Sequence, residues 1–256
     1  MDSIHSRRFG GVARLYSDAA LNRFMQSHVC VIGLGGVGSW AVEALARTGV
    51  GTLTLIDLDN VAESNVNRQL PAITSQFGMP KVTALANRVK EINPNSVVHC
   101  IEDFVTEENI PIIFAKPFDF VIDAIDQVRV KAAMAAYFLQ QRQPFIVSGG
   151  AGGRRNAMAI EVASLQEVTH DKLLANLRYT LKKRHHIGQN PKDFTKVNCV
   201  FSRESVVKPN NQYCETNASL QGLSCAGYGA SMMVTASFGL CCAQTAIDYL
   251  SKSSKN

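Results

Sequence analysis

The chain has 256 residues, of which 46% are hydrophobic and 18% charged, which excludes bulk disorder and leaves enough apolar side chains for a sizeable core. The net charge of +5 permits a polyanionic partner such as RNA without requiring one. The seven cysteines are an odd number, and none are spaced as Cys-x-x-Cys, so a structural zinc knuckle is unsupported. No secretory signal is recognisable, and we expect a cytoplasmic protein with mostly free thiols.

Strand-like and helix-like segments alternate through the first half of the chain. The expected strands are residues 29–33, 52–56, 96–101, 118–122 and 144–147, and the expected helices are 39–48, 81–92 and 128–140. This alternation predicts a Rossmann-like α/β fold with a mostly parallel sheet.

The second half of the chain has a different pattern. Residues 157–163 and, more weakly, 199–201 alternate like strands around a basic segment at 169–196. We therefore expect a single domain over residues 1–256. Its α/β part covers 1–150, and an appended, partly antiparallel part covers 151–256 on the substrate and dimer side.

Residues 226–247 contain no charged side chain and are numerous enough to cross a bilayer. The stretch is rich in Gly, Ala, Ser, Thr and Cys and is only weakly apolar. This composition favours a buried or dimer-facing helix, with peripheral membrane association as the alternative.

A glycine-rich turn joins the first expected strand to the first expected helix. It contains Gly33, Gly35, Gly36, Gly38 and Ser39. Glycines permit a tight turn and a close approach of backbone N–H groups to phosphates, which the helix dipole also attracts. Asp57, at the end of the next strand, is where an acidic residue binds ribose hydroxyls. The pattern predicts nucleotide binding but does not distinguish ATP from a nicotinamide dinucleotide.

Polar and cationic residues follow the second expected strand. In chain order after Asp57 they are Asp59, Asn65, Asn67, Arg68, Gln69 and Lys81. An ATP-cleaving enzyme uses Arg and Lys to neutralise triphosphate charge as it moves toward pyrophosphate, whereas a dehydrogenase does not need them. Asp123 and Asp126, after a later strand, suit Mg²⁺, which takes one or two carboxylates together with phosphate oxygens. The set favours ATP and Mg²⁺.

The glycine turn, Asp57, the Asn-x-Asn-Arg-Gln segment, Lys81 and the Asp-x-x-Asp pair together resemble the ThiF/MoeB/ubiquitin-activating superfamily. The resemblance implies that the turn lies under the nucleotide and that Asp57 binds the ribose. It assigns the phosphates to Asn65, Arg68, Gln69 and Lys81, and Mg²⁺ chiefly to Asp126, with Asp123 beside it. It also implies a homodimer, in which Arg8 or Arg14 reaches into the partner's active site, with Arg8 the slightly better match.

Further segments resemble one branch of that superfamily, the tRNA threonylcarbamoyladenosine dehydratases, and this similarity runs over nearly the whole chain. They are residues 7–16, 149–153, 199–202 and 224–229. The resemblance implies that ATP adenylates the threonyl carboxylate of the modified adenosine in tRNA. The carbamoyl group of the same nucleoside then attacks the activated carbonyl, a ring closes and one water is lost overall.

Three other functions remain open from the sequence. The first is activation of a ubiquitin-like or sulfur-carrier protein, although members with that role usually carry paired Cys-x-x-Cys motifs, a catalytic cysteine or both. The second is a nicotinamide-dependent oxidoreductase, and the third is a non-catalytic nucleotide-binding scaffold.

A basic stretch in the second half favours contact with tRNA phosphates. It comprises Lys172, Arg178, Lys182, Lys183, Arg184, His185 and His186, with Arg154 and Arg155 as further candidates. The dehydratase resemblance also implies a cysteine desulfurase or sulfur-acceptor partner, for which Cys225 is the thiol to watch. It further implies a monovalent cation, Na⁺ or K⁺, near the C-terminal region.

Overall fold

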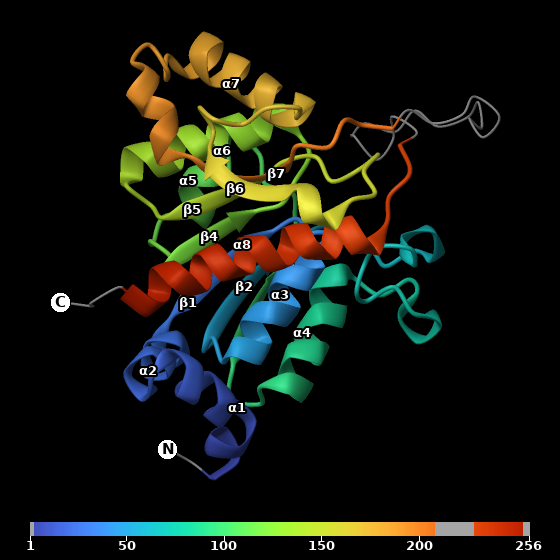
Figure 1. Cartoon of the computed structure of the whole chain (residues 1–256). Helices are drawn as coiled ribbons and strands as arrows, with labels where there is room; N and C mark the ends of the chain where they lie inside the picture. The colour runs from blue at the N-terminus through green and yellow to red at the C-terminus, as the bar shows by residue number, and fades with distance from the viewer. Residues whose placement is uncertain (1–2, 208–227, 253–256) are drawn as a thin grey trace.

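The computed structural model describes residues 3–207 and 228–252 and contains one seven-stranded sheet (Figure 1). Its strands are β1 (His28–Ile32), β2 (Thr52–Ile56), β3 (Val97–Ile101), β4 (Phe120–Asp123), β5 (Phe145–Ser148), β6 (Ile160–Ser164) and β7 (Asn198–Ser202). Their order across the sheet is β3-β2-β1-β4-β5-β7-β6. All neighbours pair in parallel except β6 and β7, which are antiparallel. The expected fold class is confirmed.

Helices cover both faces of this sheet (Figure 1). The helices are α1 (Ser3–Tyr16), α2 (Asp18–Gln26), α3 (Gly38–Thr48), α4 (Lys81–Ile92), α5 (Ile110–Ile113), α6 (Val128–Gln141), α7 (Lys172–His185) and α8 (Met232–Lys252), with 3₁₀ turns η1 (Glu63–Asn65), η2 (Thr74–Gln76), η3 (Ala157–Ala159) and η4 (Pro191–Lys196). One large apolar cluster joins the sheet to α1, α2, α3, α4 and α8, and a second joins it to α5, α6 and α7. Because both faces are covered, the central strands are continuous apolar runs.

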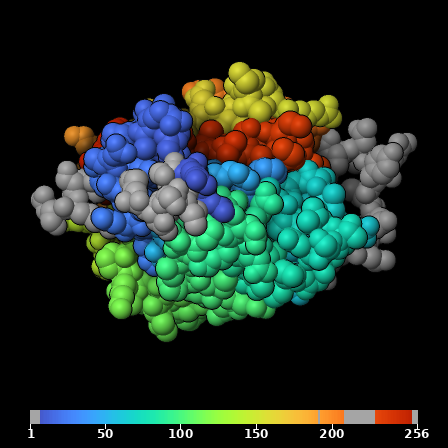
Figure 2. Space-filling model, turned by 90° about the horizontal axis from the view of Figure 1, so that it is seen from below, coloured from blue at the N-terminus to red at the C-terminus, as the bar shows by residue number. Residues whose placement is uncertain are grey.

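The uncharged C-terminal stretch forms most of α8, which packs on the sheet and against α3 and α2. Its inner side buries Val234, Phe238, Cys242 and Ala246, which confirms the expected buried helix. Part of α8 stays on the surface between the N-terminal helices and the β6 region (Figure 2). Across the described residues, no helix is long and apolar enough to cross a membrane.

Candidate functional site

A cleft of about 790 Å³ opens at the carboxyl ends of β1, β2, β4 and β5. The chain leaves β1 toward β2 on one side and later crosses to β4 on the other, so the cleft lies at the switch point where open α/β sheets bind ligands. The predicted site residues that line it are Gly33, Gly35, Gly36, Asp57, Asp59, Asn65, Asn67, Arg68, Gln69, Lys81 and Asp126.

The nucleotide loop (residues 33–38) links β1 to α3. Gly33 has a φ of +81°, and a Cβ on Gly38 would lie 1.9 Å from the Gly33 carbonyl oxygen, so both positions require glycine. The Ser39 hydroxyl donates to the Gly35 carbonyl oxygen at 2.6 Å and accepts the Leu70 N–H at 3.2 Å. Gly38 and Ser39 therefore shape the loop from behind and do not line the cleft.

Asp57 fastens the nucleotide loop to the end of β2. One carboxylate oxygen accepts the Leu34 N–H at 2.6 Å, and the other accepts the Asp59 N–H at 2.8 Å. Burial raises the pKa of the Asp57 carboxyl, against the opposing effect of Lys81, whose Nζ lies 3.8 Å away. The carboxylate thus lies beside the loop, where a nucleotide ribose is expected.

Lys81, the first residue of α4, is the buried cation of the site. Its side chain is only 5% exposed, and its Nζ donates to the Asp59 carboxylate at 2.7 Å. The Asp59 carboxylate is more than half exposed at the edge of the cleft. Lys81 is therefore held in place by a partner that itself faces solvent.

Arg68 is half-buried and has no carboxylate within ion-pair distance in the described parts of the chain. Its guanidinium donates to the Ser64 carbonyl and the Asn67 side-chain oxygen, both at 2.9 Å. Burial lowers its pKa. A cation that is partly stripped of water and lacks a counter-ion has a strong affinity for an anion.

Two amides complete this side of the cleft. The Asn65 side-chain oxygen accepts the Ala62 N–H at 3.1 Å, which shapes the turn that carries Arg68. Gln69 is 7% exposed, and its Oε1 has no hydrogen-bond partner among the described residues.

The two aspartates predicted for Mg²⁺ have different surroundings. Asp126 lines the cleft. Asp123 is 1% exposed and lies 2.8 Å from the fully buried ammonium of Lys131, and it does not line the cleft. Its carboxylate also accepts the Ile125 N–H at 3.1 Å, so it holds the turn that leads to Asp126. No group of three or more His, Cys, Asp or Glu that suits a metal occurs within the described ranges.

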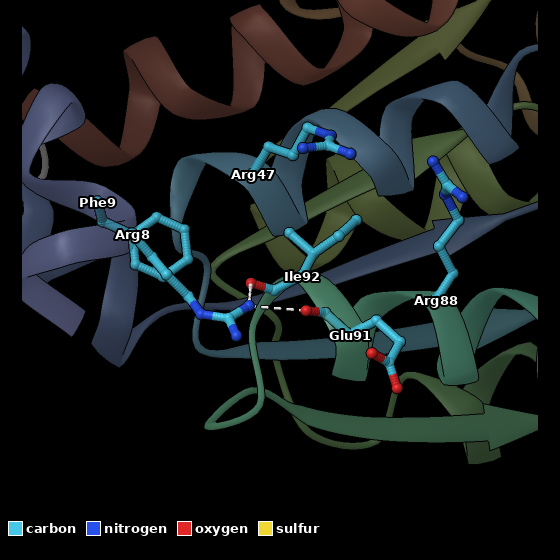
Figure 3. A pocket seen from close by; sticks show the side chains of 6 residues that line it. All are labelled: Arg8, Phe9, Arg47, Arg88, Glu91 and Ile92. Atoms are coloured by element: carbon cyan, nitrogen blue, oxygen red, sulfur yellow. Dashed lines mark hydrogen bonds between the residues drawn. The ribbon is translucent and has the colours of Figure 1, made fainter. Parts of the chain in front are cut away.

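Arg8 and Arg14 lie away from this cleft. Arg8 borders a second cavity of about 420 Å³, where its Nη1 donates to the carbonyls of Glu91 and Ile92, both at 2.7 Å (Figure 3). It therefore caps the end of α4. Arg14, in the last turn of α1, is exposed, and its guanidinium lies over Gly10 and Gly11.

The cleft has a second wall that was not assigned to the site from the sequence. Residues 149–152, here named the glycine wall, follow β5 and line the cleft, together with Tyr228, Gly229, Ala230 and Thr235. The signal in the sequence that could have assigned the glycine wall to the site was a run of glycines directly after an expected strand. The approach of α8 to the nucleotide loop had no such signal, because it is a contact between distant parts of the chain.

The basic stretch forms most of α7, but not all of its cations face solvent. Arg178 donates to the carbonyls of Leu165 and Val168 at 2.8 and 2.9 Å. The suggestion that Arg154 joins this surface is wrong, because its side chain is 1% exposed and paired with Asp171. The remaining exposed Lys and Arg side chains are Lys172, Lys182, Lys183 and Arg184 on α7 and Arg155 outside it.

Burial raises the pKa of the Cys30, Cys199 and Cys242 thiols. These three are packing residues and not nucleophiles. Cys225 lies outside the described residues.

The fold and the cleft define a nucleotide-binding protein of the adenylating type, and the chain belongs to the ThiF family, whose model matches residues 6–256. It is 44% identical over 250 residues to the tRNA threonylcarbamoyladenosine dehydratase of Haemophilus influenzae. This alignment covers 97% of this chain and 95% of that protein. It is also similar to the crystal structure of the Escherichia coli tRNA N6-threonylcarbamoyladenosine dehydratase, TcdA, in complex with ATP. That match has a TM-score of 0.89 and 41% identity and covers 97% of this chain and 96% of the other. The AMP complex of the same enzyme matches with the same TM-score, identity and coverage. The expected resemblance is confirmed.

Proposed function

We propose that this chain is an ATP-dependent, ligase- or cyclase-type tRNA-modifying enzyme that dehydrates threonylcarbamoyladenosine in tRNA through adenylation of its threonyl carboxylate. The observation that carries the proposal is Arg68, a half-buried cation beside the nucleotide loop that has no carboxylate partner among the residues the structure describes. The full-length similarity to dehydratases, one of which was solved with ATP and with AMP, supports the choice of reaction.

The chemistry divides into two steps. A threonyl carboxylate oxygen attacks the α-phosphorus of ATP, and pyrophosphate leaves. The carbamoyl group of the same nucleoside then attacks the activated carbonyl carbon, the ring closes and AMP leaves with the former carboxylate oxygen. Since the nucleophiles belong to the substrate, the protein has to hold the reactants in place and stabilise charge.

Each residue of the cleft has a place in this scheme. Asp57, fixed by the Leu34 and Asp59 N–H groups, accepts hydrogen bonds from the ribose. Arg68 and Lys81 lie where they can offset the charge of the phosphates, and Asn65, Asn67 and Gln69 shape or complete that side of the cleft. The described cysteines that are buried offer no thiolate for a covalent transfer to a carrier protein.

Mg²⁺ is part of the proposal, and the residues present fit it. Asp126 lines the cleft, and one carboxylate with phosphate oxygens and waters is a normal Mg²⁺ shell. When bound, the ion would neutralise charge on the phosphates. Asp123 acts behind it by holding the turn. A monovalent cation near the C-terminal region remains an expectation without an assigned site.

We further propose a homodimer. The exposed side of α8 carries Met233 and Leu240, which are 62% and 50% exposed, and Met158 on the neighbouring η3 is 92% exposed. Apolar side chains gathered on one surface are typical of an interface. The tRNA is proposed to contact the exposed cations of α7, and a sulfur-relay protein remains a proposed partner.

The test is to incubate the purified protein with Mg²⁺-ATP and tRNA bearing threonylcarbamoyladenosine, digest the tRNA and weigh the nucleoside. We expect the loss of one water, AMP in equal amount, and no change when ATP is omitted. An unchanged nucleoside, with ATP binding intact, would instead favour activation of a carrier protein.

A further inference from the structure

The glycine wall faces the nucleotide loop across the cleft and presents almost only backbone to it. Its residues are Gly149, Gly150, Ala151 and Gly152, so the only side-chain atom is one methyl group. Such a wall has no side chains of its own to fix its position. The position has to come from hydrogen bonds to neighbouring elements.

One buried carboxylate supplies part of that support. Asp171 lies at the N-terminus of α7, where its Oδ1 accepts the Leu174 N–H at 3.0 Å. Its Oδ2 accepts the Gly150 N–H at 3.0 Å. A single side chain therefore ties the first turn of α7 to the glycine wall.

The chain is built to admit this carboxylate. A Cβ on Gly149 would lie 2.4 Å from the Asp171 Oδ2, a distance that no real Cβ tolerates. Gly149 is therefore required for the approach of Asp171 and not only for the local turn. The Gly149 N–H itself donates to the Val200 carbonyl at 2.8 Å, which anchors the start of the wall to β7.

Arg154 neutralises the buried carboxylate. Both side chains are 1% exposed, and the Arg154 Nη2 lies 3.2 Å from the Asp171 Oδ2. The same guanidinium donates to the Gly150 carbonyl and, at 3.0 Å, to the His170 carbonyl. It also lies 5.9 Å from the centre of the Phe238 ring on α8. The pair thus joins the glycine wall to α7 and α8.

We propose that Asp171, with Arg154 as its counter-charge, is a positioning residue that fixes the glycine wall against the reacting part of the substrate. The residues proposed to contact ATP lie on the nucleotide loop and in residues 57–81, after β1 and β2, whereas the glycine wall follows β5 on the other side of β4. The wall therefore faces the threonylcarbamoyl group. The inference rests on the proposed function and adds to it a device for substrate alignment.

The experiment compares Asp171→Asn with Asp193→Asn. Asn also caps helices, so its Oδ1 can still accept the Leu174 N–H and α7 keeps its N-terminal hydrogen bond. The side-chain NH₂ group would then face the Gly150 N–H and Arg154, where two donors meet and no hydrogen bond forms. Asp193 is the matched control, because its carboxylate accepts the Gly188 N–H at 2.9 Å beyond the other end of α7 and does not line the cleft. For each variant, the dissociation constant of ATP, the melting temperature and the tRNA-dependent rate of AMP formation are measured.

We expect Asp171→Asn to lower kcat for AMP formation by roughly 10²-fold, the cost of a misplacement of about 1 Å. ATP binding should stay close to that of Asp193→Asn, which should react like wild type, whereas the melting temperature should fall because Arg154 is left buried without its counter-charge. Equal rates for the two variants would overturn the proposal. So would a loss of ATP binding in Asp171→Asn as large as the loss of rate, because that would reveal a general structural role. A wild-type protein that binds ATP but leaves the nucleoside unchanged would instead refute the proposed function.

Discussion

At the scale of single residues, the site combines a cation that is paired with carboxylates, Lys81, with a cation that has no carboxylate partner in residues 3–207 and 228–252, Arg68. Lys81 has Asp59 at 2.7 Å and Asp57 at 3.8 Å, so its charge is balanced before any ligand binds. Within the described part of the chain, the Arg68 guanidinium donates to two neutral oxygens, and the Trp40 indole N–H fixes its backbone through a 3.0 Å bond to the Arg68 carbonyl. Arg68 is therefore pre-arranged for an anion that the described residues do not supply.

Arg68→Ala is expected to lower the rate of AMP formation by about 10²–10³-fold, the usual cost of removing one preorganised electrostatic contact. Its melting temperature should change little, because no ion pair between described residues is lost. Steady-state release of pyrophosphate measures the rate. Arg129→Ala is the control, since Arg129 is 65% exposed, pairs with Glu107 and does not line the cleft. Equal activity of the two variants would remove Arg68 from the phosphate site.

At the scale of elements, the sequence allowed the strands and crossover helices of the first half to be placed within two or three residues, because each is a short apolar run or a 3.6-period stripe between glycines. Helix α7 was not recognised. Its buried stripe of Leu173, Leu174, Leu177 and Leu181 has helical spacing, but the surrounding cations dominate the composition. The nucleotide side of the cleft could be predicted because its residues directly follow β1 and β2, and the ends of these strands are marked by glycines and Asp57.

One carboxylate links α3 to α4 in addition to their apolar packing. Glu43 on α3 is 9% exposed and accepts from Arg88 on α4 at 2.6 and 2.9 Å and from Arg47 at 2.7 Å. Burial is the largest influence on the Glu43 pKa and raises it, but the bonds from Arg88 and Arg47 together outweigh burial and lower the pKa. The folded state therefore favours the charged form, and this stabilisation is lost as the pH falls through the lowered folded pKa.

Glu43→Gln is expected to reduce the free energy of unfolding by about 1 kcal/mol at pH 7, since the two arginines are partly exposed and their bonds are weakened by solvent. The difference from wild type should shrink as the pH drops below about 4.5, the ordinary pKa of the group. Urea unfolding at pH 7 and below pH 4.5 measures it. Glu161→Gln, at an exposed pair with Arg203, should show little difference at either pH. A Glu43→Gln effect that grows on acidification would contradict the assigned pKa direction.

At the scale of the whole molecule, contacts between segments that are distant in the chain could not be predicted from the sequence. Nothing in residues 151–202 shows that β7 joins β5 in parallel while β6 becomes the antiparallel edge, because register and order depend on which faces are left uncovered. Arg154 was interpreted as a surface cation for the same reason, since its burial depends on Asp171 and Phe238. The sequence did not predict that the glycine wall lines the site, and the folded structure shows that it does.

Which arginine could act across a dimer also depends on the fold of the whole molecule. Arg8 is committed to the carbonyls at the end of α4, whereas Arg14 is exposed, so Arg14 has the freer guanidinium. Each site of a homodimer would then combine Arg68 of one protomer with Arg14 of its partner. Arg14→Ala and Arg68→Ala proteins should each be inactive as homodimers.

Unfolding and refolding an equal mixture of the two variants should restore about a quarter of wild-type activity, because half of the dimers are mixed and each mixed dimer has one intact site. The recovered rate of AMP formation, compared with each variant refolded alone, measures this. Arg8→Ala should instead lower the melting temperature, because it leaves two carbonyls at the end of α4 uncapped. If Arg14→Ala is inactive and mixing restores nothing, Arg14 acts within its own subunit. If Arg14→Ala is fully active, no site depends on it.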